Sequence, residues 1–216
     1  MIKPVVQGAH PALYRFYCRL VSGIWRLAGG RLKATGLENV PRQGPCLLIA
    51  NHQSYLDPLF LHAAVPRVLH AMAKSTQFAS PAMARILAHI YVFPVRRYQI
   101  DAQAVRTVLR RLSHGHAVMI YVEGERTWDG RLQPPRRGVI RLLLKAGVPI
   151  IPCRIEGSYE VMPRWDSRIR PGTVHITFGP PMQFPRLDER ADRERALPDA
   201  IAAVTAALSG QIDQAR

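Results

Sequence analysis

One segment decides the predicted fold and reads Cys46-Leu47-Leu48-Ile49-Ala50-Asn51-His52-Gln53-Ser54-Tyr55-Leu56-Asp57-Pro58. Its first five residues are apolar and follow a proline, which is typical of a short buried strand. The next apolar residues, 59–64, predict a helix, so Asp57 is expected to cap it with Pro58 at its first position. A turn between strand and helix would bring His52 back towards Asp57. A histidine held by a carboxylate is a general base with a fixed tautomer.

The rest of the chain alternates predicted strands with predicted helices. Apolar or alternating runs predict further strands at 31–36, 67–73, 91–95, 117–122, 148–155 and 173–178. Helical patterns occur at 81–89, 101–112, 137–146 and 188–208, with Ser80 and Asp101 as caps. This alternation predicts an α/β layered fold, with a largely parallel mixed sheet flanked by helices. Because sites in such sheets lie at the carboxyl ends of strands, residues that follow strands are expected to converge.

The N-terminal segment, residues 1–30, predicts an amphipathic helix and no signal peptide. Its apolar side holds Leu13, Phe16, Tyr17, Leu20, Val21, Ile24 and Ala28, and its polar side holds Arg15, Arg19, Ser22 and Arg26. At about 1.5 Å per residue the helix spans roughly 24 Å, short of a ~30 Å hydrocarbon core. Contact with a membrane interface is favoured over packing on the protein's own core. The expected organisation is a membrane-associating segment over 1–30 and one domain over 31–210.

The composition limits the classes of partner and site. The formal net charge is +15, and only four of the 30 basic residues are lysines. Codon bias accounts for the arginine preference, but the excess of bases predicts nucleic acid, an anionic bilayer or an acidic protein as partner. Nucleic-acid binding is disfavoured because no helix-turn-helix, zinc-finger or RNA-binding signature occurs. Three scattered cysteines without metal spacing predict a reducing compartment and no metal site.

Two further segments place charged residues directly after predicted strands. Residues 91–97 end in Arg96 and Arg97, whose planar guanidinium groups match phosphate. In residues 121–127, Tyr-Val-Glu-Gly-Glu-Arg-Thr, Glu123 is suited to orient an arginine and Arg126 to meet an anionic headgroup. Gly124, between them, permits close approach of the backbone at a turn.

The apolar segment Val148-Pro149-Ile150-Ile151-Pro152-Cys153-Arg154-Ile155 completes the pattern. Its prolines interrupt a regular ladder, so it is expected to be irregular. The four segments, in this order, resemble the signature blocks of the glycerolipid acyltransferases, the family of lysophosphatidic acid acyltransferase. The resemblance covers roughly residues 31–180. It departs from the family pattern at Val122, where proline is common, and at Glu125, where a small or hydroxyl residue is more usual.

The resemblance implies an enzyme of phospholipid biosynthesis. It would transfer a fatty acyl group from acyl-CoA or acyl-carrier protein to the free hydroxyl of a lysophospholipid. The expected acceptor is 1-acyl-sn-glycerol 3-phosphate, giving phosphatidic acid; the change at Glu125 leaves another acceptor, such as a lyso-ornithine lipid, open.

The family blocks also imply roles for particular residues. His52 would act as the base, Asp57 would orient it, and Arg126 with Arg96 or Arg97 would hold the phosphate, Arg97 being favoured. Segment 148–155 would line an acyl groove or form core.

The same resemblance implies the partners and location of the protein. No cofactor or metal is expected. The expected partners are the two substrates, an anionic membrane surface and an acidic acyl-carrier protein. The protein is expected at the cytoplasmic face of the cell membrane, held peripherally or monotopically.

Overall fold

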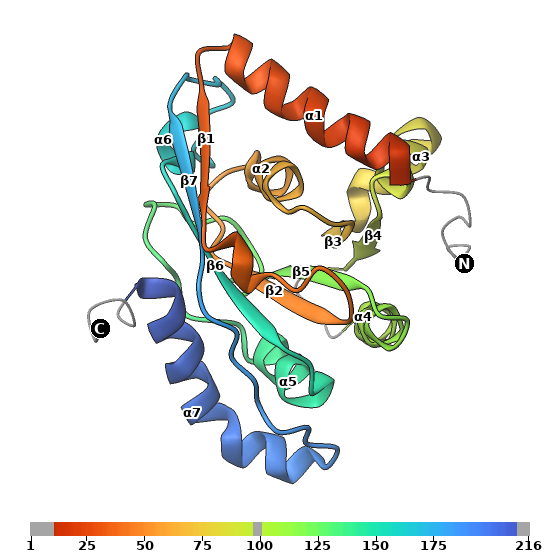
Figure 1. The fold of residues 1–216 in the computed structure, drawn as a ribbon. Helices are drawn as coiled ribbons and strands as arrows, with labels where there is room; N and C mark the ends of the chain where they lie inside the picture. Colours follow the sequence, from red (N-terminus) through yellow and green to blue (C-terminus); the bar gives the residue numbers. More distant parts are fainter. Residues whose placement is uncertain (1–10, 97–100, 211–216) are drawn as a thin grey trace.

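The computed structural model describes residues 11–96 and 101–210 of the 216-residue chain. Within these residues, one seven-stranded sheet lies between two layers of helices (Figure 1). The strand order is β1-β7-β6-β2-β5-β3-β4, and every neighbouring pair is parallel except β6 and β7. The predicted α/β layered fold with a largely parallel mixed sheet is confirmed.

The elements agree closely with those predicted. The strands are β1 (Arg31–Thr35), β2 (Cys46–Ala50), β3 (Leu69–Lys74), β4 (Val92–Val95), β5 (Ala117–Tyr121), β6 (Ile150–Glu156) and β7 (Thr173–Phe178). The helices are α1 (Pro11–Leu27), α2 (Asp57–Ala64), α3 (Pro81–His89), α4 (Ala102–Ser113), α5 (Arg137–Ala146), α6 (Ser158–Val161) and α7 (Arg190–Ser209). Short 3-10 turns at Leu37–Asn39 and Ser75–Phe78, and the one-turn helix α6, were not predicted.

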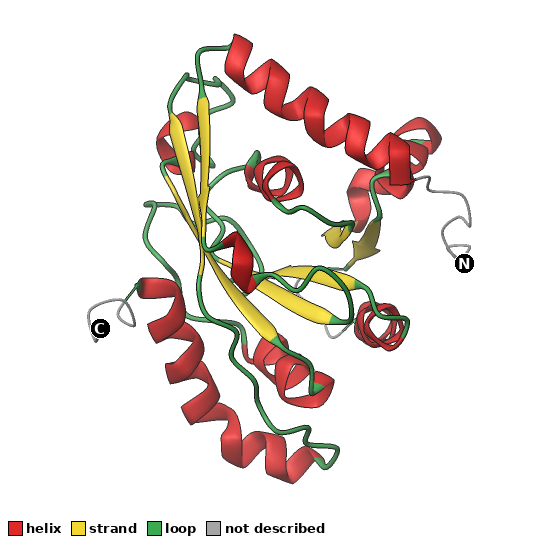
Figure 2. Ribbon diagram, in the orientation of Figure 1, coloured by secondary structure: helices red, strands yellow, loops and turns green. Residues whose placement is uncertain are grey.

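The sheet is covered on both faces. Helices α1 and α2 lie on one face and α4, α5 and α7 on the other (Figure 2). Strand β2 lies at the centre of the sheet, and all five of its residues are buried. A strand buried on both faces reads as a continuous apolar run, which is why residues 46–50 show no alternation.

The predicted caps had mixed outcomes. Asp101 caps α4, because its side chain accepts hydrogen bonds from the backbone N–H groups of Gln103 and Ala104. Ser80 precedes α3 but makes no side-chain capping bond. The predicted cap at Asp57 is wrong: this residue is the first of α2, and its carboxylate faces the preceding loop instead of the helix.

Strand β6 is regular on one side and interrupted on the other. It pairs with β2 from Ile150 to Cys153, so Pro152 does not break that ladder. Its pairing with β7 begins only at Cys153. A proline has no N–H to donate, so the missing bonds fall on the β7 side. The predicted irregularity is confined to that side.

Helix α1 has three different faces along its length. Tyr14 and Trp25 are buried against α2, with Trp25 edge-on to Phe60 at 5.1 Å between ring centroids. A second apolar stripe faces away from the protein; its members are Leu13, Phe16, Leu20, Ile24 and Leu27, all exposed. The third face carries the exposed Arg15, Arg19 and Arg26. The helix therefore packs on the core and also presents an apolar surface.

None of the helices in the described parts of the chain is long and apolar enough to cross a bilayer. Residues 1–10 lie outside the described residues. The predicted boundary at residue 30, between a membrane-associating segment and the domain, stays a prediction.

Candidate functional site

The centre of the site is a histidine–carboxylate pair between β2 and α2. His52 Nδ1 donates to Asp57 Oδ2 at 2.8 Å, and both residues are buried. The same oxygen accepts the backbone N–H groups of Gln53 at 2.7 Å and Ser54 at 2.8 Å. Three donors on one carboxylate oxygen fix the turn that the sequence predicted between strand and helix. Because the acceptor is a carboxylate, a neutral imidazole carries its proton on Nδ1, which leaves Nε2 as the basic nitrogen.

The loop after β5 holds His52 from the opposite side. The backbone N–H of His52 donates to Glu123 Oε1 at 2.9 Å, and its carbonyl accepts the N–H of Thr127 at 2.8 Å. The imidazole ring stacks on Tyr121, with centroids 3.8 Å apart and planes 12° apart. Two segments 70 residues apart in sequence therefore form one cluster, as their places after neighbouring parallel strands predicted.

The Glu123 carboxylate lies against the histidine loop. Its carboxylate binds the backbone of His52 and forms no ion pair with an arginine among the described residues. The nearby arginine, Arg136, instead donates from Nε to the Glu123 carbonyl at 3.0 Å. Burial raises the pKa of Glu123 to about 7. The predicted function of orienting an arginine stays a prediction, and in the described residues the Glu123 carboxylate accepts the backbone N–H of His52.

Gly124 occupies a turn that only glycine accommodates easily. Its φ is +73°, and a Cβ at this position would lie 3.2 Å from Cγ of Arg136. The close approach predicted for this glycine is therefore an approach to Arg136.

The unusual Glu125 is engaged by two arginines. It pairs with Arg136 at 2.6 Å and with Arg164 at 3.0 Å. Arg164 also lies over the ring of Trp128, 4.0 Å from its centroid. These contacts link the loop after β5 to α5 and to the segment after α6.

Two of the predicted phosphate-binding arginines, Arg126 and Arg96, follow β5 and β4 at the same edge of the sheet. The Arg126 guanidinium lies 5.2 Å from the ring centroid of Tyr55, in the loop that follows His52. Arg96 is about half exposed, and it contacts Asp101 at 3.5 Å. Arg97 lies outside the described residues.

A cavity of about 570 Å³ opens where the sheet splits. Strands β3 and β5 pair only from Leu69 to Ala71, and beyond that point β3 continues beside β4 while β5 continues beside β2. Met72 and Tyr121, both just past the split, line the cavity, and α4 and α5 complete its wall. Segment 148–155 contributes no side chain to this cavity; most of it is buried core.

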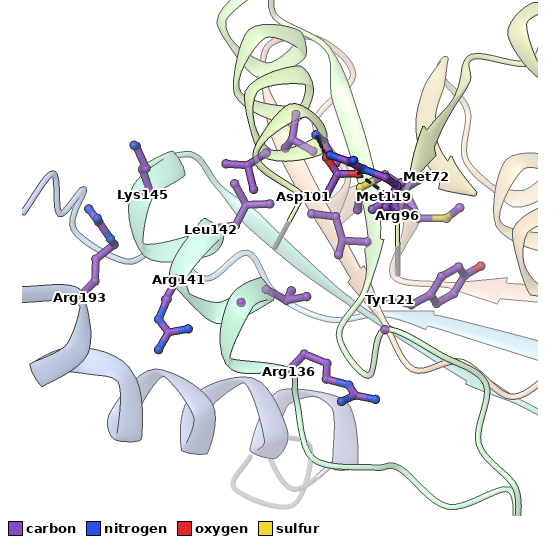
Figure 3. A pocket seen from close by; sticks show the side chains of 18 of the residues that line it. Met72, Arg96, Asp101, Met119, Tyr121, Arg136, Arg141, Leu142, Lys145 and Arg193 are labelled. Carbon is purple, nitrogen blue, oxygen red and sulfur yellow. Dashed lines mark hydrogen bonds and ion pairs between the residues drawn. The ribbon is translucent and has the colours of Figure 1, made fainter. Parts of the chain in front are cut away.

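The cavity has apolar walls and a basic mouth. Figure 3 shows Tyr121 at one end and Lys145 and Arg193 at the other. The cations that line it are Arg96, Arg136, Arg141, Lys145, Arg190 and Arg193, and the one carboxylate among its lining residues is Asp101. Such a cavity suits an apolar chain attached to a polyanionic group.

Three further residues make contacts at the site that the sequence did not reveal. Asn51 ties β2 to β6, since its amide donates to the Ile155 carbonyl at 2.8 Å and accepts the Ile155 N–H at 2.7 Å. Tyr121 stacks on the histidine, and Arg136 braces the turn at Gly124. Asn51 adjoins the histidine in sequence and could have been singled out, but the other two contacts depend on residues distant in sequence.

A family model and several known proteins match this chain. The family model described as Acyltransferase matches residues 31–156. A chloroplastic 1-acyl-sn-glycerol-3-phosphate acyltransferase of Brassica napus is 28% identical over 164 residues, covering 74% of this chain and 47% of the relative. The enzyme of that name from Bacillus subtilis is 25% identical over 203 residues, covering 94% of this chain and 96% of its own. The chain spans about half the length of the first two curated relatives that it matches.

A solved structure shares the fold. The crystal structure of the 1-acyl-sn-glycerophosphate acyltransferase PlsC from Thermotoga maritima has a TM-score of 0.75 and 19% sequence identity. The match covers 94% of this chain and 80% of that one.

Proposed function

Because this chain belongs to the Acyltransferase family, we propose that it transfers a fatty acyl group from an acyl thioester to the free hydroxyl of a lysophospholipid. The acceptor is 1-acyl-sn-glycerol 3-phosphate and the product is phosphatidic acid. The observation that carries the proposal is the buried pair of His52 and Asp57, next to the ring that lines an apolar, basic-mouthed cavity.

In the proposed reaction, His52 acts as a general base. Nε2 removes the proton of the acceptor hydroxyl, and the oxygen attacks the thioester carbonyl to form a tetrahedral intermediate. Collapse of the intermediate expels the thiolate, which takes the proton back from the imidazolium. Asp57 keeps the ring oriented and stabilises its positive charge, and such base catalysis supplies about 10²–10⁴-fold. Positioning of the two substrates supplies much of the remaining acceleration. No step is assigned to a metal or prosthetic group.

The acceptor phosphate is proposed to bind arginines beside the catalytic pair. Arg126 lies over Tyr55, in the loop between His52 and Asp57, so its charge is close to the base. Arg96 or Arg97, after β4, is the second proposed ligand. Charge-assisted bonds of this kind are each worth roughly 1.5–3 kcal/mol.

The donor's acyl chain is proposed to occupy the cavity at the sheet split. Its volume of about 570 Å³ lies within the range of about 300–1,000 Å³ common for ligand pockets. The cations at its mouth suit the phosphates of coenzyme A or the acidic surface of an acyl-carrier protein. Both donors therefore remain part of the proposal.

The protein is proposed to bind the cytoplasmic face of the membrane through α1. The exposed apolar stripe of this helix runs from Leu13 to Leu27 and is flanked by arginines that attract anionic lipids. Three free cysteines, two of them buried, support a reducing location.

A panel assay tests the proposal. Purified protein is incubated with lysophosphatidic acid, lyso-ornithine lipid and other lyso-lipids, each with acyl-CoA and with acyl-carrier protein, and the products are identified by mass spectrometry. We expect phosphatidic acid from wild type and none above background from His52→Ala. Transfer only to lyso-ornithine lipid would replace the acceptor, and no transfer to any lyso-lipid would refute the proposed reaction.

A further inference from the structure

Tyr121 is a lining residue of the cavity and also the aromatic neighbour of the His52 imidazole. Tyr121, the last residue of β5, is half-buried and lines the cavity where β5 parts from β3. The same ring stacks on the His52 imidazole, 3.8 Å away and nearly parallel. A side chain that borders both the base and the cavity is placed to act on the reaction through the base.

The hydroxyl of Tyr121 takes no part in these contacts. Its oxygen is buried and has no hydrogen-bond partner among the described residues. A buried hydroxyl without a partner is unfavourable, so a phenylalanine would satisfy the same packing better. The ring, and not the hydroxyl, is therefore the part of Tyr121 that the geometry uses.

The stack restricts tilting of the imidazole plane. Nδ1 donates to Asp57, and rotation about that hydrogen bond would tilt the ring. A nearly parallel ring at 3.8 Å blocks that tilt on one side. An aromatic face also attracts a cation, and the attraction is larger where water is excluded. The ring therefore favours the imidazolium that forms when the base takes a proton.

From this arrangement we propose that Tyr121 is a positioning residue: its ring sets the plane of the His52 imidazole and stabilises the protonated base during acyl transfer. The proposal rests on the function proposed above. The ionisable groups that face the histidine loop are Asp57 from α2 and Glu123 from the loop after β5, and Arg126 follows in the same loop. The test variants leave Asp57 and Glu123 unchanged, so a change in the pH dependence of the reaction reports on Tyr121.

The test compares Tyr121→Phe, which keeps the ring, with Tyr121→Leu, which removes it. We expect Tyr121→Phe to keep kcat within about twofold of wild type. Tyr121→Leu should lower kcat by about 3- to 30-fold with little change in the acceptor KM, and should move the acid limb of the kcat/KM profile about 0.5–1.5 pH units lower. Leu142→Met, which changes the cavity wall from α5, is the matched control and should leave the pH profile in place.

A second measurement needs no substrate. In the NMR spectrum of wild type, the ring protons of His52 should lie upfield of ordinary histidine positions because they sit over an aromatic face. Tyr121→Phe should preserve this shift, and Tyr121→Leu should abolish it. Because this readout is independent of turnover, it separates failure of the stack from failure of the proposed reaction.

Three results would overturn the proposal. The first is a loss of activity in Tyr121→Phe as large as that in Tyr121→Leu, which would assign the effect to the hydroxyl. The second is a Tyr121→Leu protein with reduced kcat but an unmoved acid limb, which would assign a packing role only. The third is the absence of an upfield shift in wild type.

Discussion

The loop that holds His52 and the arginines proposed to bind substrate phosphates lie at the same edge of the sheet, but they differ in how completely the protein itself contacts them. His52 is held by Asp57, by the Glu123 carboxylate and by the Tyr121 ring, and it is buried. Arg126 lies over a tyrosine and Arg96 is about half exposed. The proposed base is thus held by groups of the protein itself, whereas Arg96, one of the arginines proposed to bind the anion, is about half exposed. Such a difference would keep the acyl-transfer step the same while the choice of acceptor could vary.

The largest expected effect is at the proposed base. His52→Ala should lower kcat by about 10²–10⁴-fold or more while the protein still folds, because it removes the proton acceptor. Single-turnover assays with circular dichroism as the folding control measure this effect. Normal turnover in a folded His52→Ala protein would show that His52 is not the base. The comparison between the two regions would then no longer hold.

The arginines proposed to bind phosphate should affect binding more than chemistry. Arg126→Ala should raise the KM for a phosphate-bearing acceptor by about 10- to 100-fold and change kcat much less, because it removes a charge-assisted contact. Arg168→Ala, at an exposed arginine outside the site, is the control. If the KM of Arg126→Ala stays at the wild-type value, the phosphate binds elsewhere. Arg126 would then no longer belong to the comparison between the two regions.

The third expected effect concerns stability at the histidine loop. Burial raises the pKa of Glu123 from 4.5 to about 7. The folded protein therefore holds this proton more tightly than the unfolded chain does. This group therefore contributes stability below about pH 4.5 that is lost as the pH rises through about 7. Glu123→Gln keeps an acceptor for the His52 N–H and removes the titration. Its free energy of unfolding relative to wild type should increase by about 1–3 kcal/mol between pH 4.5 and 7.5.

Urea denaturation at the two pH values measures this difference. Glu160→Gln, at an exposed glutamate of α6, is the matched control and should show little change between them. If Glu123→Gln changed the free energy of unfolding by the same amount at both pH values, the Glu123 carboxylate would not be held in the arrangement described.

The smallest expected effect concerns the exposed apolar stripe of α1. Replacing Phe16 and Leu20 together by serine should weaken binding to anionic vesicles by about tenfold, because two exposed apolar side chains no longer enter the lipid. Ile169→Ser, at an exposed isoleucine outside α1, controls for general loss of apolar surface. Sedimentation with vesicles measures the binding, and an unchanged affinity would place the membrane contact elsewhere.

These point variants are preferable to removal of the N-terminal segment. Tyr14 and Trp25 are buried against α2, so deletion of residues 1–30 would expose part of the core. A deletion would therefore confuse membrane binding with loss of stability.

Much of the fold and the central pair of the site could be predicted from local patterns. The five-residue spacing of His52 and Asp57 across a turn allowed their contact, and the resemblance to the acyltransferase signature made that contact the expected one. The role of Asp57 as a helix cap was wrong, since three donors in the preceding loop compete for the same carboxylate oxygen. Spacing identifies which groups meet but not which of several donors a carboxylate accepts.

The contacts that sequence could not reveal join residues far apart in the chain. Glu123 reaches the backbone of His52, 71 positions earlier, and the Tyr121 stack depends on the register of β5 against β2. The cavity arises because β3 and β5 stop pairing after Ala71, which no run of apolar residues signals. The resemblance to a family supplied the site residues, but their hydrogen-bond partners required the structure.

If α1 binds the membrane as proposed, its packing on α2 would also set the height of His52 relative to the lipid surface. Helix α2 begins with the carboxylate that holds the base, and near its other end the His62 ring bonds to the hydroxyl of Tyr14 on α1 at 2.9 Å. The helix proposed to lie in the headgroup layer and the helix that begins with Asp57 are thus joined as one rigid unit. On the proposed membrane contact, a lipid that reaches His52 would rise from the bilayer by a distance that this pair of helices sets, and not by one that a flexible tether allows.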